Sequence, residues 1–518
     1  MIARAWYAAL AAVFIAALAV RLVALDERPM HTDEAVHGVG LGRLLEGHGY
    51  RYDPVDYHGP TLYYLTLPWA WLRGERTAEA LTEFTLRAVP AFLGASLILL
   101  LVPWRKVIGG WGVLWAALFI ACSPIQLYYH RVYIHETLLV FLGFALLNCL
   151  LSWFTKPRLW IALTAGLLAG LMHATKATSA LMFAAMAGAW ILCWLWVRLR
   201  GTERTPLAEL PPLNVSLRHA GWAALVALAV SALLHSAFFT HPAGIMDSIT
   251  AYFISPDRAA GQGHEKPWYT HLHWVGGYRS GGFLWTEAFL LGLGVFGLFF
   301  SNVWKKRSPG LPTLGTPLLG WYAILLMVIY ALIPYKTPWL MLGPMLIMTV
   351  LAGSGAAAMV RLAHWTWARI GVVAVLLLGT AQLGAQARRA AFRFAADERV
   401  PYVYSHTSPD AVRLAARIVK SMDWLPETER VVQVAAEEYW PLPWYLRSLD
   451  RVGYWNERPP RLVAPVIVLS RPISAEARAE LEATHRSTFA GLRPGVLVVV
   501  WFREDLWERI INPKKEEE

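Results

Sequence analysis

Long apolar runs fill most of the first 390 residues and constrain the fold more than any other feature of this chain. About eleven of them approach or reach the roughly 20 residues that an α-helix needs to cross a bilayer. They lie near 5–25, 84–103, 112–128, 136–154, 159–175, 178–197, 219–239, 283–303, 315–333, 339–360 and 369–387. With 56% hydrophobic residues, the chain has more apolar surface than a soluble core can bury. The sequence predicts an α-helical multispanning membrane protein with about 11 transmembrane helices.

Lysine and arginine gather in the short connections at 105–106, 156–158, 198–218, 305–307 and 361–369. The positive-inside rule places these connections and the N-terminus in the cytoplasm. The segments 26–83 and 241–282 and everything after about residue 388 then lie outside it. We therefore expect a multi-pass protein of the plasma (inner) membrane. The net charge of +11 is explained by membrane orientation, and we predict no binding of nucleic acid.

The segment 389–518 has ordinary polarity and predicts a small extracytoplasmic α/β domain that follows a transmembrane domain at 1–388. Strands are expected at "RVVQVA", "APVIVLS" and "GVLVVVWF", and a helix at "SAEARAELEATH". Another helix should begin at Ser408 or Asp410. All three cysteines fall inside apolar runs, so no disulfide framework is expected.

The stretch "PMHTDEAVHG", at 29–38, carries the adjacent carboxylates Asp33 and Glu34 shortly after the first apolar run. They have a structural interpretation, because Thr32 is a good N-cap and acids favour the first turn of a helix. They also have a functional one, because ionisable residues beside membrane spans often face a cavity and carry function.

Four other stretches place ionisable groups on the same predicted side of the membrane. They are "YHGPTLYYL" with His58, "YYHRVYIHE" with Arg131 and Glu136, "HATKATS" with Lys176, and "IPYKTPW" with Lys336. Each has an alternative: the side chains of Arg131 and Lys336 could snorkel, Glu136 could begin a helix, and Lys176 could anchor a turn. Together they favour one shared site.

These stretches resemble the GT-C glycosyltransferases, multispanning enzymes that use polyprenyl-phosphate-linked sugars. The acidic pair and "HGPTLYYL" are similar to motifs of the branch that contains the protein mannosyltransferases and the aminoarabinose transferase, although His58 stands where that branch often has lysine. "YKTPW", "GHEKPW" and "PYVYSHTSPD" with "EYWPLPWYLR" are similar to the flippase activity-associated proteins linked to archaeal glycosylation.

This resemblance implies a membrane glycosyltransferase that moves a sugar from a polyprenyl-phosphate-linked donor to an acceptor hydroxyl on the outer face. The reaction needs a base and positive charge beside the departing phosphate. Asp33 matches the family's catalytic acid and is the expected base. Glu34 would orient the acceptor or tune Asp33, and Glu136 would support them. The expected phosphate ligands are Arg131, Lys176 and Lys336, with His58 as a further substrate-binding residue.

In the 241–282 loop, His264, Glu265, Lys266 and Trp268 are expected to bind substrate, with aromatic faces suited to sugar rings. This is not the zinc protease motif, because Trp268 stands where the second histidine would be. We predict no metal ligands. The chemistry requires no cofactor, although some relatives use a divalent metal, so a metal ion stays an open alternative. The expected partners are the lipid-linked donor, membrane lipids, and a glycan, lipid or protein acceptor.

Two other functions are compatible with the sequence. One is a flippase-associated component handling lipid-linked saccharides, which needs polar residues along a path through the bilayer. The other is a non-catalytic sugar-binding or assembly protein. The enzyme hypothesis makes a geometric prediction: Asp33 and Glu136 should face one outward-opening cavity, with at least two of the cations roughly 10 Å away or less.

Overall fold

The computed structural model describes residues 2–55, 58–199, 212–259, 265–303, 312–457, 459, 461–470 and 473–512. Its contacts form two compact units. The first, which we call the helical unit, comprises Met1–Leu25, Gly49–Pro68 and Arg87–Tyr404. The second, which we call the sheet unit, comprises Asp26–His48, Trp69–Leu86 and Ser405–Glu518. The predicted boundary at 388 stays a prediction, and each unit is described separately.

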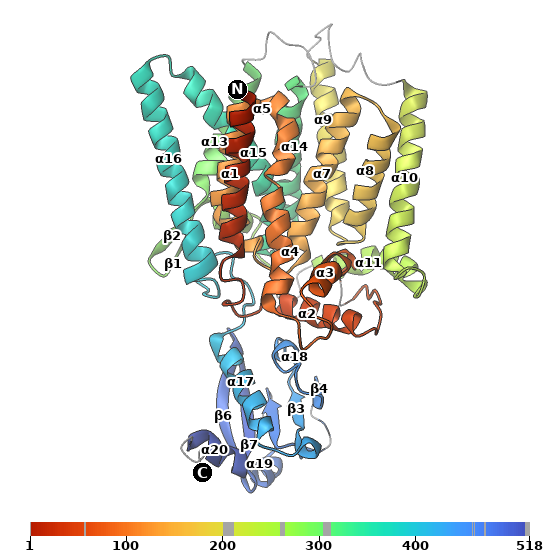
Figure 1. Ribbon diagram of the computed structural model, residues 1–518, viewed down its shortest axis with the longest axis vertical. Coiled ribbons are helices and arrows are strands. Elements are labelled where there is room, and N and C mark those ends of the chain that lie inside the picture. Colours follow the sequence, from red (N-terminus) through yellow and green to blue (C-terminus); the bar gives the residue numbers. More distant parts are fainter. Residues whose placement is uncertain are drawn as a thin grey trace. The chain divides into compact units, whose positions relative to one another are not determined.

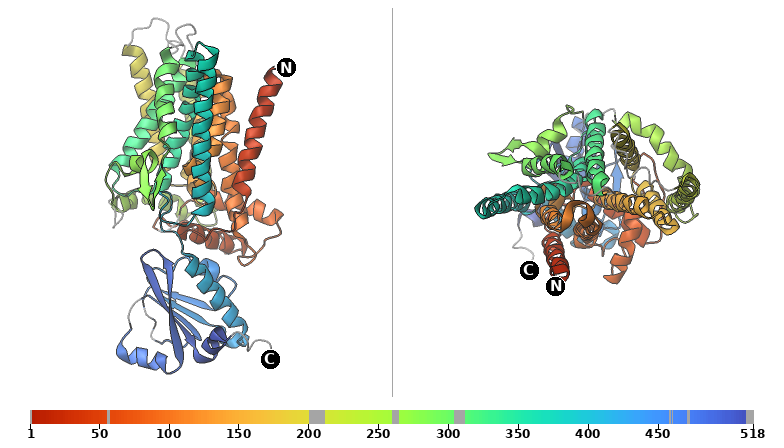
Figure 2. Two further views of the ribbon diagram at one scale, coloured as in Figure 1. Left: turned by 90° about the vertical axis from the view of Figure 1, so that its left-hand side faces the viewer. Right: turned by 90° about the horizontal axis from the view of Figure 1, so that it is seen from above.

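The long helices of the helical unit run side by side and roughly parallel (Figures 1 and 2). Two helices, α3 and α4, continue across the boundary between the units. The elements are α1 (Ile2–Leu22), α3 (Thr61–Leu72), α4 (Glu83–Ser96), η1 (Leu99–Trp104), α5 (Arg105–Cys122), α6 (Pro124–Tyr129), α7 (His135–Thr155), α8 (Leu159–His173), α9 (Ser179–Leu199), α10 (Leu213–His235), α11 (Ala243–Ala259), α12 (Thr270–Gly276), β1 (Tyr278–Ser280), β2 (Phe283–Trp285), α13 (Ala288–Val303), α14 (Pro312–Leu332), η3 (Pro338–Met341), α15 (Leu342–Leu362), α16 (Thr366–Arg388) and η4 (Arg389–Arg393).

Eight helical stretches among the described residues are long and apolar enough to cross a membrane. They are Arg4–Leu22, Glu83–Cys122, His135–Thr155, Ser179–Trp196, Leu213–His235, Gly315–Leu332, Pro338–Leu362 and Thr366–Arg393. The predicted spans 84–103 and 112–128 lie in the single stretch Glu83–Cys122, which is kinked at Gly109 with a φ of 80°. The predicted spans 159–175 and 283–303 correspond to the shorter apolar helices Leu159–His173 and Ala288–Phe300. The prediction of a multispanning helical membrane protein is confirmed.

Helix α15 forms the core of the helical unit, and every residue from Leu342 to Ala358 is buried. It packs against α5, α13 and α14. Small residues permit this approach, because a Cβ added at Gly353 would lie 2.4 Å from the Gly112 carbonyl oxygen. One added at Gly297 would lie 2.2 Å from the Leu351 carbonyl oxygen. Close backbone approach of this kind is typical of helix packing in membranes.

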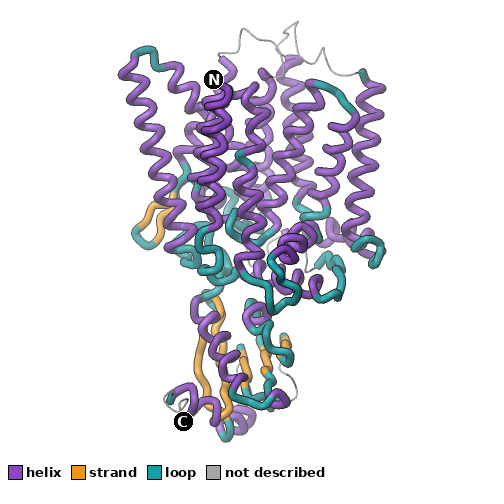
Figure 3. Tube along the Cα trace, viewed as in Figure 1, coloured by secondary structure: helices purple, strands orange, loops and turns teal. Residues whose placement is uncertain are grey.

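The sheet unit contains a five-stranded sheet in the order β4-β3-β5-β7-β6, drawn in orange in Figure 3. Strand β3 is parallel to β4 and β5, whereas β7 is antiparallel to β5 and β6. The elements are α2 (Thr32–Leu45), α17 (Pro409–Asp423), η5 (Glu427–Glu429), β3 (Val432–Ala435), α18 (Leu442–Tyr445), β4 (Val452–Trp455), β5 (Val466–Leu469), α19 (Ala475–Glu482), β6 (His485–Arg493), β7 (Val496–Arg503) and α20 (Glu504–Ile511). The three predicted strands are β3, β5 and β7. Ser408 is the N-cap of α17, accepting a hydrogen bond from the Ala411 amide.

Helix α2, which carries the acidic pair, packs against α18. The indole of Trp444 is buried and lies so close to Gly38 that an added Cβ would be 2.6 Å from it. Trp444 Nε1 also donates to Glu83 Oε1 at 2.8 Å. Arg447 donates to the carbonyls of Ala78 and Leu81, at 3.1 and 2.8 Å. These contacts fix α2 to the C-terminal part of the chain.

Candidate functional site

The acidic pair stands in the first turn of α2, as expected, but the cap is different from the predicted one. His31 is the N-cap, and its Nδ1 accepts a hydrogen bond from the Asp33 amide at 3.0 Å. Glu34 completes a capping box by accepting from the His31 amide at 2.9 Å. Thr32, the predicted cap, instead donates its hydroxyl to the Ser405 carbonyl at 3.2 Å. N-cap positions usually carry serine, threonine, asparagine or aspartate, whose side-chain oxygen accepts the hydrogen bond. Here the imidazole nitrogen of His31 takes that place.

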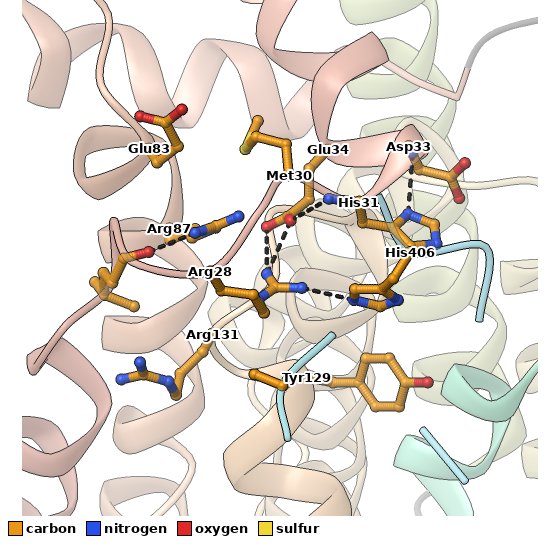
Figure 4. Close-up of polar contacts among 12 residues, drawn as sticks. Arg28, Met30, His31, Asp33, Glu34, Glu83, Arg87, Tyr129, Arg131 and His406 are labelled. Atoms are coloured by element: carbon orange, nitrogen blue, oxygen red, sulfur yellow. Dashed lines mark hydrogen bonds and ion pairs between the residues drawn. The ribbon is translucent and has the colours of Figure 1, made fainter. Parts of the chain in front are cut away.

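Glu34 is fully buried and paired with Arg28. Arg28 Nη2 lies 2.9 and 2.8 Å from its two carboxylate oxygens (Figure 4). Arg28 Nη1 lies 2.7 Å from His406 Nε2. A guanidinium can only donate, so His406 Nε2 accepts. In this structure the Glu34 carboxylate joins Arg28 to the His31 amide, and its expected role toward an acceptor stays a prediction.

Asp33 differs from Glu34 although the two are adjacent. Its side chain is half-buried, and Figure 4 shows the carboxylate turned away from the Arg28–Glu34 pair. Within the part of the chain that the structure describes, this carboxylate accepts no hydrogen bond. Its electrostatic partner is Arg493, whose Nη1 donates to Thr32 Oγ1 at 3.0 Å. The oxygen lone pairs of Asp33 are therefore available, while hydrogen bonds to its amide and to Thr32 hold its backbone in place.

Glu136 and Lys176 form an ion pair in the helical unit. Glu136 lies in the first turn of α7, and Lys176 lies in the turn between α8 and α9. Their side chains are 7% and 11% exposed, respectively, so the charges neutralise each other in a mostly buried setting. Glu136 also lines a narrow pocket with about 270 Å³ of space not filled by atoms. Its other walls are Leu139, Val140, Thr178, Met182, Tyr330, Trp339, Leu340 and Gly343.

The loop of His58 is bound to the turn of Lys176. The Gly59 amide donates to the Thr175 carbonyl at 3.1 Å, and a Cβ at Gly59 would lie 1.9 Å from the Ala174 carbonyl oxygen. His58 packs edge-on against His135, with ring centroids 5.2 Å apart. Three stretches singled out in the sequence, around residues 58, 136 and 176, therefore meet in the helical unit.

Arg131, a predicted phosphate ligand, contacts backbone carbonyls in this structure, and phosphate binding stays a prediction. Its Nη1 donates to the carbonyls of Val20, Arg21 and Val23 at 3.2, 2.8 and 2.6 Å. Its Nη2 donates to Ala24 O at 3.0 Å. These are the carbonyls at and just beyond the end of α1, which lack helical partners and carry the negative end of the dipole. Arg131 is a helix cap.

Lys336 is likewise a cap, and not the outward-facing cation expected from its prolines. It is 1% exposed, and its Nζ donates to the carbonyls of Tyr330 and Ala331 at 3.1 and 2.8 Å, and to that of Ile333. These carbonyls close the end of α14. The ammonium group thus donates to backbone carbonyls that would otherwise lack a hydrogen-bond donor.

The two motifs "GHEKPW" and "YKTPW" pair with each other. Glu265 forms a backbone bridge with Tyr335, and the Lys266 amide donates to the Pro334 carbonyl at 3.2 Å. The side chain of Glu265 is exposed, that of Lys266 half-buried and that of Trp268 66% exposed. His264 lies outside the described residues.

Sequence reasoning did not select Arg28, His31, His406, Arg493 or His271. His271 Nε2 lies 3.1 Å from the Thr337 carbonyl, and burial lowers the pKa of this imidazole to about 4. The one signal for His406 was its position in the motif "PYVYSHTSPD". Within the described residues, no three His, Cys, Asp or Glu side chains are grouped so that they could hold a metal ion.

The chain has a GT-C-like fold, shared with the solved structures of two other membrane proteins. Two structures of ArnT from Cupriavidus metallidurans, one bound to undecaprenyl phosphate and one in the apo state, match it with TM-scores of 0.61 and identities of 15% and 16%. The match to the bound structure covers 96% of this chain and 98% of the ArnT chain. The match to the apo structure covers 98% of this chain and 99% of the ArnT chain.

The oligosaccharyltransferase AglB from Archaeoglobus fulgidus, in complex with an inhibitory peptide and a dolichol-phosphate, matches with a TM-score of 0.56 and 12% identity. The match covers 86% of this chain and 63% of that one. No family model and no curated protein matches the sequence, so the resemblance to the flippase activity-associated proteins stays a prediction.

Proposed function

We propose that this protein is a membrane glycosyltransferase that moves a sugar from a polyprenyl-phosphate-linked donor to an acceptor hydroxyl on the outer face of the membrane. The fold supports the class of enzyme, since the similar structures are those of membrane glycosyltransferases. Two of them hold a polyprenyl phosphate, which supports this class of donor. The acceptor is a glycan, a lipid or a protein.

The state of Asp33 carries the proposal. A general base must have a free lone pair and a fixed position. The backbone of Asp33 is fixed by the His31 cap, by the buried Arg28–Glu34 pair and by Arg493 on Thr32. Its carboxylate, in contrast, is half-buried and not committed to a hydrogen bond within the described residues. This combination suits a base and is not needed for capping a helix.

In the proposed reaction, Asp33 removes the proton of the acceptor hydroxyl. The acceptor oxygen forms a new bond to the anomeric carbon of the sugar. The bond from that carbon to the phosphate oxygen breaks, and its electron pair leaves with the polyprenyl phosphate. The products are the glycosylated acceptor, protonated Asp33 and the free lipid phosphate.

For the donor side, we retain Lys176, with Glu136 as the carboxylate that holds it. The two other cations named from the sequence are committed to helix ends, whereas Lys176 is bound to a side chain and borders the loop of His58. A phosphate could displace Glu136 from Lys176, because an ammonium is a mobile point charge with three donors.

The test is transfer from a radiolabelled polyprenyl-phosphate sugar by the purified full-length protein. Asp33→Asn should lower the rate about 10²- to 10⁴-fold, the usual contribution of a general base. A matched control exists, because Asp410 is also the second residue of its helix, α17. Asp410→Asn removes the same charge from the same helix position, and we expect a wild-type rate.

Equal rates in Asp33→Asn and wild type would remove Asp33 as the base. Donor binding without transfer by the wild-type protein, with every class of acceptor supplied, would instead favour a component that handles lipid-linked saccharides.

A further inference from the structure

A bulge in the edge strand β6 brings an arginine of the sheet to the start of α2. Strand β6 pairs regularly with β7 from His485 to Gly491, and the register then shifts before Arg493, which pairs with Val496. The turn that follows contains Pro494 and Gly495, with a φ of 79° at the glycine. Such bulges redirect side chains and are frequent beside active sites.

Ser408 holds this bulge in place. Its amide donates to the Leu492 carbonyl at 2.9 Å, and its hydroxyl donates to the Gly491 carbonyl. Two residues earlier, His406 forms a backbone bridge with His31. Three segments, at 28–34, 405–408 and 491–493, are thus joined within the sheet unit. The joint fixes the direction of the Arg493 side chain relative to the start of α2.

The Arg493 guanidinium is mostly buried, with 13% of the side chain exposed. Nη1 donates to Thr32 Oγ1 at 3.0 Å, and Nη2 pairs with Glu438. Burial lowers the pKa of Arg493, and the charge of Asp33 opposes that effect. Arginine remains protonated in either case. A permanent positive charge is therefore held against Thr32, the residue before Asp33, and interacts electrostatically with the Asp33 carboxylate.

We propose that Arg493 is a positioning residue for Asp33: it holds Thr32 in place and stabilises the ionised carboxylate, so that the C-terminal sheet completes the catalytic apparatus. This inference rests on the proposed function. It assigns the C-terminal domain a part in the reaction itself, in place of an accessory role.

The electrostatic argument has a definite sign. A positive charge near a carboxylate favours its ionised form, so removing the charge makes the base protonate at higher pH. The other titratable or charged groups at this position are His31 at the cap, Glu438 on Arg493, and Arg28, Glu34 and His406 behind the cap. Arg493→Gln also leaves Glu438 without its arginine, so the separate variant Glu438→Gln is needed to distinguish the two charges.

The experiment measures kcat/KM for transfer between pH 4 and pH 9 in the full-length protein. Arg493→Gln should shift the acidic limb of the profile upward by roughly half a unit to one unit, with a rate about 3- to 10-fold lower below the limb. Arg493→Lys should restore most of the wild-type profile. Arg486, on the same strand and paired with Glu504, gives the matched control, and Arg486→Gln should leave the profile unchanged.

Glu438→Gln provides a second and opposite test. The Glu438 side chain is 54% exposed, so we expect its replacement to leave the fold intact, and its negative charge shares the arginine with Asp33. The acidic limb should then move to lower pH. If neither variant moves the limb, Arg493 has no influence on the base and the inference is wrong. If wild-type protein transfers no sugar, the proposed function fails instead, and if Asp33→Asn is fully active, Asp33 is not the base.

Discussion

The buried pair of Arg28 and Glu34 should be one of the most sensitive points of the sheet unit. The two side chains are 8% and 0% exposed, and the guanidinium contacts both carboxylate oxygens. Replacing Arg28 by Met leaves the Glu34 charge buried without its cation. Breaking a buried pair in this way costs about 3 to 5 kcal/mol.

For a unit of this size, about 1 kcal/mol changes Tm by roughly 2 to 4 °C. Arg28→Met should therefore lower Tm by at least about 6 °C, measured by tryptophan fluorescence on the full-length protein in detergent. A matched pair is available on α19, where Arg478 and Glu482 are 66% and 54% exposed. Arg478→Met should change Tm by no more than about 2 °C, because exposed pairs contribute little.

A double variant separates the charge from the cap. Glutamine can replace glutamate in a capping box, so Arg28→Met with Glu34→Gln removes the buried charge and keeps the hydrogen bond to the His31 amide. It should recover most of the lost stability. The reasoning is refuted if the double variant is no more stable than Arg28→Met, or if Arg28→Met is as mild as Arg478→Met.

Two further predictions concern other buried groups. Lys336→Met should reduce the stability of the purified protein by about 1 to 3 kcal/mol, because three carbonyls at the end of α14 lose their hydrogen-bond donor. The control Lys266→Met, at a half-buried position, should leave stability unchanged. A Lys336→Met protein that is as stable as wild type but uses the lipid-linked sugar less well would contradict this assignment. Burial lowers the pKa of His485 in the folded protein. As the pH falls below about 6.5, this histidine is protonated in the unfolded chain before it is protonated in the folded one, so the folded state loses stability in that range. Melting curves at pH 7.5 and 5.0 should show a smaller pH effect in His485→Gln than in wild type, and an equal effect would exclude this histidine as a source.

The sheet shows which strands a sequence reveals. The predicted strands β3, β5 and β7 are the three interior strands, whereas the unpredicted strands β4 and β6 are the two edges. Interior strands are covered on both sides and give continuous runs of apolar β-branched residues. Edge strands face solvent along one side, and "HRSTFAGLR" in β6 has the mixed composition typical of such positions.

The backbone contacts of Lys336 and Arg131 differ in how predictable they were from the sequence. Lys336 follows its carbonyl partners by only three to six residues, and a lysine near a helix C-terminus is a known capping pattern. Local sequence rules could therefore have identified it. Arg131 caps a helix that ends more than 100 residues earlier in the chain. No local pattern contains that information, because the contact joins residues that are far apart in the sequence and exists only in the folded chain.

The three carboxylates predicted to be catalytic differ in how their charge is compensated. Glu34 is neutralised by Arg28, and Glu136 by Lys176, each in a mostly buried pair. Asp33 has only the partial electrostatic support of Arg493, which it shares with Glu438. A buried acid that serves structure alone is satisfied by its neighbours, because an unsatisfied one costs stability. Asp33 is half-buried, and its carboxylate accepts no hydrogen bond within the described residues, so it has the free lone pairs that the proposed base needs.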